Sequence, residues 1–346
     1  MMTSHNRQDA REKAGTGLLT GPKGECNERY GATAQRHVRF DESDTGMKVK
    51  HEDGDIHVVD YNALLGWDEL LPWQQDNEFI LRSHRRATNS YLRSLRSVFR
   101  VHNETVNIWS HLVGAAIFFS AAVLLYLRRN SKGHRDDRYS TDADDVAVDI
   151  YFVSVITCFF FSFIYHIFLD HSECTRIWTA RFDYLGIVIP LWGTTMSSTH
   201  FGFYCEPRLQ NAYAIVGTFA GLACAFTTLH PSFAGPASRR FRSGMYVFLG
   251  LSSFVPIIHG ILLFGLDAMN KRMSLWYYVA LGLFHGSGAA LYASRVPERW
   301  WPGRCDVVGS SHQVMHVLVV LGAATYAVGV LRAREYWTGV DFVTLH

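Results

Sequence analysis

Two histidines four positions apart, His312 and His316, stand near the start of an apolar run and offer the clearest chemistry in the chain. Four residues advance an α-helix by about 6 Å and turn it by about 40°, so both imidazoles project from one face. Two nitrogens placed in this way can bind one zinc ion. The alternative is that each is a neutral core histidine, hydrogen-bonded to a neighbouring helix.

A third histidine, His166, lies near the end of another apolar run, in the segment SFIYHIFLDHSE. With the membrane topology argued below, His166, His312, His316 and Asp183 all lie at a similar depth on one side of the bilayer. Three nitrogen ligands and an open position for water are typical of a catalytic zinc site. We therefore predict that the three histidines bind Zn²⁺.

Asp183 and Ser162 are the predicted catalytic residues of this site. Asp183 is expected to be a fourth ligand or the group that takes a proton from metal-bound water. It could also be the N-cap of a helix, and because a carboxylate has two oxygens, both roles are compatible. Ser162 precedes His166 by one helical turn and would donate a hydrogen bond to substrate, or instead to a carbonyl of its own helix.

The composition identifies the kind of protein that must position these residues. Charged residues make up 18% of the 346 residues, against about 25% in an average soluble domain. The formal net charge of +2 argues against a nucleic-acid-binding surface, which needs a local basic excess. Residues 1–107 are polar and charged, whereas the rest of the chain holds long uncharged runs. This division excludes a soluble enzyme and indicates a polytopic membrane protein.

Apolar stretches of about 20 residues predict an all-α membrane protein with a bundle of seven transmembrane helices. Helices are required because a chain in hydrocarbon must pair its backbone groups internally, and the runs lack the alternation of a β-barrel. The predicted spans are residues 108–127, 147–169, 182–203, 209–229, 243–264, 275–294 and 312–331.

The long polar N-terminal part favours a cytosolic N-terminus and an extracytosolic C-terminus, because the first 30 residues carry no apolar core of a signal peptide. Lysine and arginine residues are also somewhat more frequent on the side of the N-terminus. This topology places the metal site near the cytosolic face. The plasma membrane and the endoplasmic reticulum are both compatible with it.

Four regions are expected along the chain. Residues 1–58 have the composition of a disordered cytosolic arm. Residues 59–107 mix leucine and aromatic residues with charges, which predicts a juxtamembrane amphipathic helical segment. Residues 108–334 form the zinc-binding seven-helix domain, and residues 335–346 form a short C-terminal tail.

Several longer segments of the chain resemble the progestin and adipoQ receptor family, which contains the adiponectin receptors, their fungal relatives and haemolysin III-related proteins. The chain is most similar to a fungal-type member, and the segments follow the family's order and spacing. These segments are NEFIL (77–81), LRSVFRVHNETVNIWSHLVG (95–114), SFIYHIFLDHSE (162–173), FDYLGI (182–187) and RVPERWWPGRCDVVGSSHQVMHVLVVLGA (295–323).

The resemblance implies a seven-helix fold with a cytosolic N-terminus and a zinc ion near the cytosolic face. The family's ligand histidines fall on His166, His312 and His316, its water-holding aspartate on Asp183, and its motif serine on Ser162. It also implies an intramembrane hydrolase with ceramidase activity, and for fungal relatives a role in lipid and zinc homeostasis.

Together these observations predict a zinc-dependent hydrolase that cleaves a lipid amide, converting ceramide to a sphingoid base and a fatty acid, in lipid and zinc homeostasis signalling. The first alternative is a non-enzymatic receptor for an extracellular protein ligand, with a structural zinc. The second is zinc sensing or transport. Direct coordination by Asp183 would favour the receptor, because structural zinc sites are usually closed by four protein ligands.

Overall fold

A computed structural model describes residues 47–50, 56–60, 62–130, 141–233 and 238–339 of the chain. The chain divides into two units, Met1–Asp60 and Tyr61–His346, which we describe separately. In the first unit, β1 (Met47–Lys50) and β2 (Ile56–Val59) form an antiparallel pair. Residues 1–58 are predicted to be disordered. Apart from the residues of β1 and β2, this segment lies outside the described residues.

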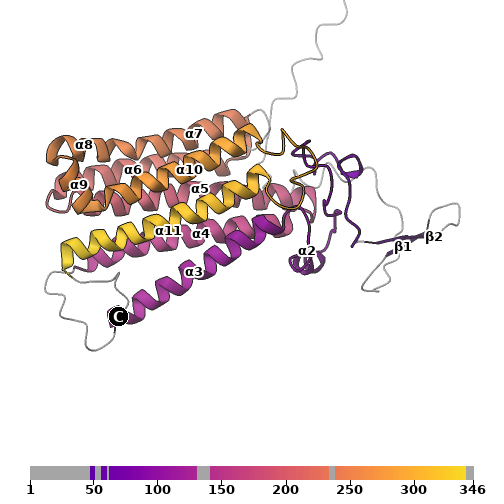
Figure 1. Cartoon of the computed structure of the whole chain (residues 1–346), viewed down its shortest axis with the longest axis horizontal. Helices are drawn as coiled ribbons and strands as arrows, with labels where there is room; N and C mark the ends of the chain where they lie inside the picture. Colours follow the sequence, from indigo (N-terminus) through magenta and orange to yellow (C-terminus); the bar gives the residue numbers. More distant parts are fainter. Residues whose placement is uncertain (1–46, 51–55, 61, 131–140, 234–237, 340–346) are drawn as a thin grey trace, which may run out of the picture. The chain divides into compact units, whose positions relative to one another are not determined.

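The second unit is a bundle of long helices that run back and forth along one axis (Figure 1). A short helix, α9, turns the chain between α8 and α10. The long helices are α3 (Thr105–Asn130), α4 (Asp142–Phe168), α5 (Glu173–Gly202), α6 (Pro207–Leu229), α7 (Arg239–Ser252) with α8 (Phe254–Phe264), α10 (Leu275–Ser294) and α11 (Ser311–Thr338), and α9 is Leu266–Met273.

Each of the seven predicted spans coincides with one of these helices, or with the pair α7 and α8, and overruns the helix by at most one residue. The prediction of an all-α bundle of seven helices is therefore confirmed. By length and apolar composition alone, five segments of the described chain are long enough to cross a membrane: α3, α4, α6, residues 241–264 and α11.

Helix α5 is less apolar than these five because it buries hydroxyl groups inside the bundle. Thr194, Thr195, Ser197, Ser198 and Thr199 are all buried. Threonine hydroxyls there donate to carbonyls one turn earlier, as Thr195 does to Leu191 at 2.8 Å. Such bonds satisfy a hydroxyl without a partner from another helix, so a polar stretch can cross the core.

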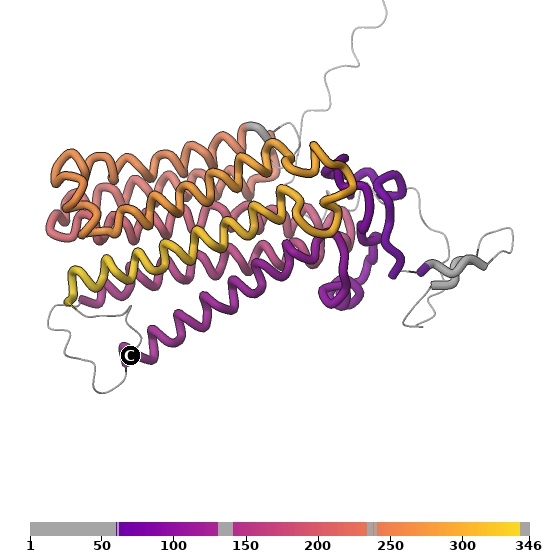
Figure 2. Tube along the Cα trace, in the orientation of Figure 1, coloured from indigo at the N-terminus to yellow at the C-terminus, as the bar shows by residue number. Residues whose placement is uncertain are grey.

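The bundle has two ends (Figure 2). We call them the arm end, where residues 62–104 lead into α3, and the far end. At the arm end α3 and α11 begin and α4 ends, whereas at the far end α4 begins and α5 and α11 end. Helix α4 lies centrally, in contact with α3, α5 and α11. Its aromatic residues join the main hydrophobic core, where Tyr151 and Phe159 pack with Tyr326 of α11.

The chain before α3, residues 62–104, is called the arm. Helical structure in the described part of the arm is limited to η1 (Trp67–Glu69) and α2 (Tyr91–Ser97). Arg85 is buried and fixes the arm to the bundle, because its guanidinium donates to the carbonyls of His166, at 2.6 Å, and Ile167, at 3.1 Å. These carbonyls lie at the C-terminal end of α4, where no further helical turn supplies donors.

Helices α4 and α5 approach each other closely at Gly193 of α5. A Cβ atom at this position would lie 2.3 Å from Ser154 Oγ, 2.7 Å from Ser154 Cβ and 3.2 Å from the Ile150 carbonyl oxygen. Non-bonded carbon atoms are in contact at about 3.5 to 4.0 Å, so a side chain there must push α4 away. This contact therefore sets the separation of the helices that bear His166 and Asp183.

The substitution Gly193→Ala is expected to destabilise the protein by about 1 to 3 kcal/mol, the usual effect of overpacking a filled interior. The measurement is the thermal unfolding midpoint of the detergent-purified protein. Gly286→Ala is the matched control, because Gly286 is also helical but has no neighbouring atom within 4 Å of its added Cβ. Equal unfolding midpoints for the two variants would contradict the close approach.

Candidate metal centre

Three histidine side chains from two helices converge at the arm end of the bundle. His166 lies in the last turn of α4, and His312 and His316 lie in the first two turns of α11. One ligand nitrogen from each of the three lies within 4.8 Å of the others, in a group that is able to hold a metal ion. His166 and His316 are buried, and His312 is half-buried.

The three imidazole rings face a common centre rather than stacking on one another. Ring centroids are separated by 5.1 Å between His166 and His312, and by 4.8 Å for each of the other two pairs. All three pairs are steeply inclined, with interplanar angles of 64° to 76°. Inclined rings direct their in-plane lone pairs toward one point, as ligands of a tetrahedral ion require.

The hydrogen bonding of His166 leaves one ring nitrogen for a metal. Its Nδ1 lies 2.8 Å from Oε2 of Glu104, and an ionised carboxylate only accepts, so Nδ1 carries the proton. In the neutral ring Nε2 then bears the lone pair, and this buried atom has no hydrogen-bond partner among the described residues. A buried acceptor without a partner is costly, and a bound cation would satisfy it. The donor set thus fits a divalent ion such as zinc.

Two other histidines of the bundle, His200 and His259, differ because they find hydrogen-bond partners within the chain. At the far end, His200 Nε2 lies 2.8 Å from Asp144 Oδ1, and Gln210 Nε2 lies 3.0 Å from His200 Nδ1. His259 Nδ1 is 2.7 Å from the Tyr213 hydroxyl. These two histidines are half-buried and hydrogen-bonded to neighbouring helices, which is the alternative that the sequence left open for each histidine.

Glu104 is a site residue that the sequence analysis missed. It directly precedes α3, and its carboxylate accepts hydrogen bonds from His166, from Asn107 at 2.6 Å and from Asn103 at 3.2 Å. Burial alone would raise the pKa of the Glu104 carboxyl, but the hydrogen bonds from His166 and Asn107 hold it below its ordinary value. The sequence held a signal for Glu104: its carboxylate stands just before the first predicted span, at the same end of the bundle as His166.

His102 supports the backbone of Glu104 as a neutral imidazole. Its Nδ1 accepts from the Glu104 N–H at 3.1 Å, and its Nε2 donates to the Ser97 carbonyl at 3.2 Å. Burial, reinforced by the nearby Arg85 charge, lowers the pKa of His102 to about 3. The ring therefore stays neutral at physiological pH, and its two hydrogen bonds fix one tautomer.

Asp183 and Ser162 lie beside the histidines but outside the group of three nitrogens. Ser162 is buried one turn before His166 on the same face of α4, and it lies close to the Asp183 carboxylate of α5. Among the described residues, the group with ligand spacing contains only the three histidines. Asp183 therefore lies outside the group whose ligand atoms are spaced to hold an ion.

The structure rejects the alternative that Asp183 is a helix N-cap. Helix α5 begins at Glu173, and its N-cap is Ser172, whose side chain accepts from the Thr175 N–H. Asp183 thus lies about three turns inside the helix. The prediction failed because Arg176, Arg181 and two threonines interrupt the apolar residues between Glu173 and Asp183, so a search for uncharged runs started the helix too late.

The start of α11 is fixed from two sides. Glu298 is buried and accepts from the Ser311 N–H at 2.7 Å and from the Ser311 hydroxyl. Gln313 Nε2 donates to the Asn103 carbonyl at 2.9 Å, which links α11 to the arm. Carboxylates at a helix N-terminus accept from its free N–H groups, and their negative charge interacts favourably with the positive end of the helix dipole. His312 stands between these two anchors, so its backbone position is well defined.

His111 of α3 also lies against the site. Its ring stacks on His316 with centroids 3.9 Å apart and an interplanar angle of 22°. Near-parallel rings at that distance do not direct their nitrogens toward one ion, and His111 is not part of the ligand group. It therefore packs against His316.

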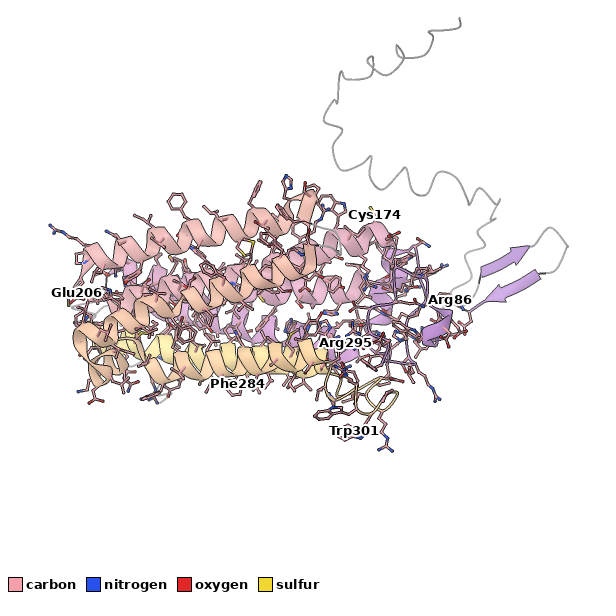
Figure 3. The ribbon with its side chains drawn as sticks, turned by 90° about the horizontal axis from the view of Figure 1, so that it is seen from above. Arg86, Cys174, Glu206, Phe284, Arg295 and Trp301 are labelled. Atoms are coloured by element: carbon pink, nitrogen blue, oxygen red, sulfur yellow. The ribbon has the colours of Figure 1, made fainter. Side chains whose placement is uncertain are left out.

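Figure 3 shows that the arm end, marked by Arg295 and Trp301, lies opposite the end that carries Glu206.

Comparison with known proteins agrees with this architecture. Residues 99–327 match the family described as Haemolysin-III related. The chain is 34% identical over 271 residues to the adiponectin receptor protein of Drosophila melanogaster, covering 78% of this chain and 59% of that protein. It is 33% identical over 272 residues to the ADIPOR-like receptor IZH2 of Saccharomyces cerevisiae, covering 79% and 84% of the two chains.

The name of a plant relative states that it has seven helices. The chain is 30% identical over 304 residues to heptahelical transmembrane protein 3 of Arabidopsis thaliana, covering 79% of this chain and 88% of that protein. The resemblance inferred from the motifs is thus confirmed, and the apolar helices mark an integral, multi-pass membrane protein. The chain belongs to the Haemolysin-III related family, together with the adiponectin receptors and their fungal relatives.

Proposed function

We propose that the protein is a zinc-dependent hydrolase that cleaves the amide bond of a ceramide-like lipid and acts in lipid and zinc homeostasis signalling. The observation that carries this proposal is the convergence of three histidine nitrogens, with His166 Nε2 buried and lacking a partner. Three imidazole donors suit zinc better than magnesium or calcium, which prefer oxygen ligands. His166, His312 and His316 would hold the ion.

Zinc in such a site supplies Lewis acidity, which activates water and stabilises charge that develops on a carbonyl oxygen. The Asp183 carboxylate is the general base, taking a proton from the attacking water and returning it to the departing amide nitrogen. Ser162 lies close to that carboxylate and would help to orient it. Since Asp183 lies outside the group of ligand nitrogens, a position remains for water or substrate.

The surroundings of Asp183 suit a lipid substrate. Phe182, the residue before it, is exposed on α5, and its ring lies 5.5 Å from that of Phe161 on α4. Phe160 is exposed as well. Acyl chains that approach from the bilayer would meet aromatic surface beside the polar site, so the amide can reach Asp183 while the chains stay out of water.

The arm end is proposed to face the cytosol, so that the metal centre lies just inside the inner membrane surface. The polar arm, residues 62–104, leads into α3 at this end. The second candidate function is a receptor for an extracellular protein ligand with a structural zinc. It is favoured by the names of the relatives, which include an adiponectin receptor and an ADIPOR-like receptor.

Replacing both His312 and His316 by alanine is expected to abolish bound zinc, because a single remaining imidazole cannot hold the ion. The measurement is the zinc content per chain of the purified protein, by inductively coupled plasma mass spectrometry. His259→Ala is the control, since it removes a half-buried histidine whose Nδ1 already pairs with Tyr213. Full retention of zinc by the double variant would contradict the proposed metal site.

Asp183→Asn is expected to retain zinc but to lower lipid hydrolysis by about 10² to 10⁴-fold, the usual contribution of a general base. The assay measures, by mass spectrometry, fatty acid released from ceramide by the purified protein with and without chelator. Asp149→Asn is the control, because this exposed aspartate pairs with Arg129 away from the site. If wild-type protein holds zinc yet releases no fatty acid, the receptor becomes the better conclusion.

A further inference from the structure

We propose that Glu104 is a positioning residue of the metal centre, which acts through His166 and sets the affinity for the ion. The inference rests on the metal site of the proposed function and adds to it the residue that fixes one ligand. Glu104 stands outside the bundle helices, in the last residue of the arm. The arm would therefore be part of the metal site rather than a cover for it.

The contact between Glu104 and His166 has the geometry of a charge-assisted hydrogen bond. Oε2 of Glu104 lies 2.8 Å from Nδ1 of His166, and the side chains are 15% and 1% exposed. By accepting the Nδ1 proton, the carboxylate selects the tautomer whose lone pair is on Nε2, toward His312 and His316. It also prevents rotation of the ring and makes Nε2 a stronger donor to a cation.

Glu104 is itself held in place from several directions. Asn107, one turn into α3, donates to Oε2 at 2.6 Å, and Asn103 donates to Oε1 at 3.2 Å. The Glu104 N–H donates to His102 Nδ1 at 3.1 Å. Both carboxylate oxygens are thus engaged, so Glu104 is not free to become a ligand. A carboxylate fixed in this way orients His166 without the entropic cost of ordering a mobile side chain.

The arm contacts both helices that supply the ligands. On α4, Glu104 holds the His166 ring, and Arg85 donates to the His166 carbonyl at 2.6 Å. On α11, Gln313, the neighbour of His312, donates to the Asn103 carbonyl at 2.9 Å. Residues 103 and 104 therefore connect the two ligand-bearing helices, and the carboxylate is the member of this junction that touches a ligand ring.

The test compares the zinc affinity of purified full-length protein with that of Glu104→Gln and Glu104→Ala, by competition with a chromophoric chelator. Loss of such a carboxylate typically weakens metal binding about 10 to 100-fold. Glu104→Gln is expected to fall between wild type and Glu104→Ala, because its amide oxygen still accepts from Nδ1. Asp306→Asn is the control, a buried carboxylate at the same end that accepts from the arm backbone at Leu81.

Two further measurements separate positioning from a merely structural role. A positioning residue lowers the affinity while one ion per chain is still bound at saturation, and it changes the visible absorption of a Co²⁺-substituted site. In a His166→Ala background, Glu104→Gln is expected to have no further effect, because the side chain through which it acts is gone.

Unchanged affinity in Glu104→Ala, or an equal loss with and without His166, would overturn the inference. A lower number of ions per chain at saturation in Glu104→Gln, with unchanged affinity, would do so as well, since it marks misfolding. Absence of zinc binding by wild-type protein has a different meaning, because it overturns the proposed metal site and this inference with it.

Discussion

Polar groups buried in a membrane-spanning bundle must find their partners inside the protein, because lipid offers none. The histidines of this chain show two ways of meeting that constraint. At the far end, His200 is satisfied on both ring nitrogens, by Asp144 and by Gln210. At the arm end, His166 is satisfied on Nδ1 only, and its Nε2 shares a common centre with His312 and His316. Among the described residues, this Nε2 is one of several buried histidine nitrogens at the arm end without a hydrogen-bond partner; the others are both ring nitrogens of His111 and Nδ1 of His316.

The rest of the architecture follows from holding that centre in place. Helix α4 is central and contacts each of the helices that bring a site residue, which are α3, α5 and α11. Its close approach to α5 at Gly193 sets where Asp183 meets Ser162. The arm then closes the end of the bundle, with Arg85 on the last carbonyls of α4 and Gln313 of α11 on the Asn103 carbonyl. Ligand positions are thus fixed by contacts between segments distant in sequence.

Much of this could be predicted from short-range patterns. Apolar runs near 20 residues located every membrane-spanning helix, because hydrocarbon selects for length and composition. The spacing of His312 and His316, and of Ser162 and His166, predicted which side chains share a helix face, because the helical repeat fixes it. The start of α5 was placed too late, since charged residues in its first turns interrupt the apolar run. Glu104 was missed because its partner is 62 residues away.

The sequence by itself therefore determined the class of protein, the helices, and the side chains that share a helix face, since these depend on periodicity and on transfer into lipid. Only the tertiary structure decided which faces meet. It brought His166 to His312 and His316, left Asp183 outside the ligand group, and paired Glu104 with the His166 ring. The physical reason is that helix packing and hydrogen bonding between distant segments depend on the three-dimensional arrangement of all helices, which no local pattern encodes.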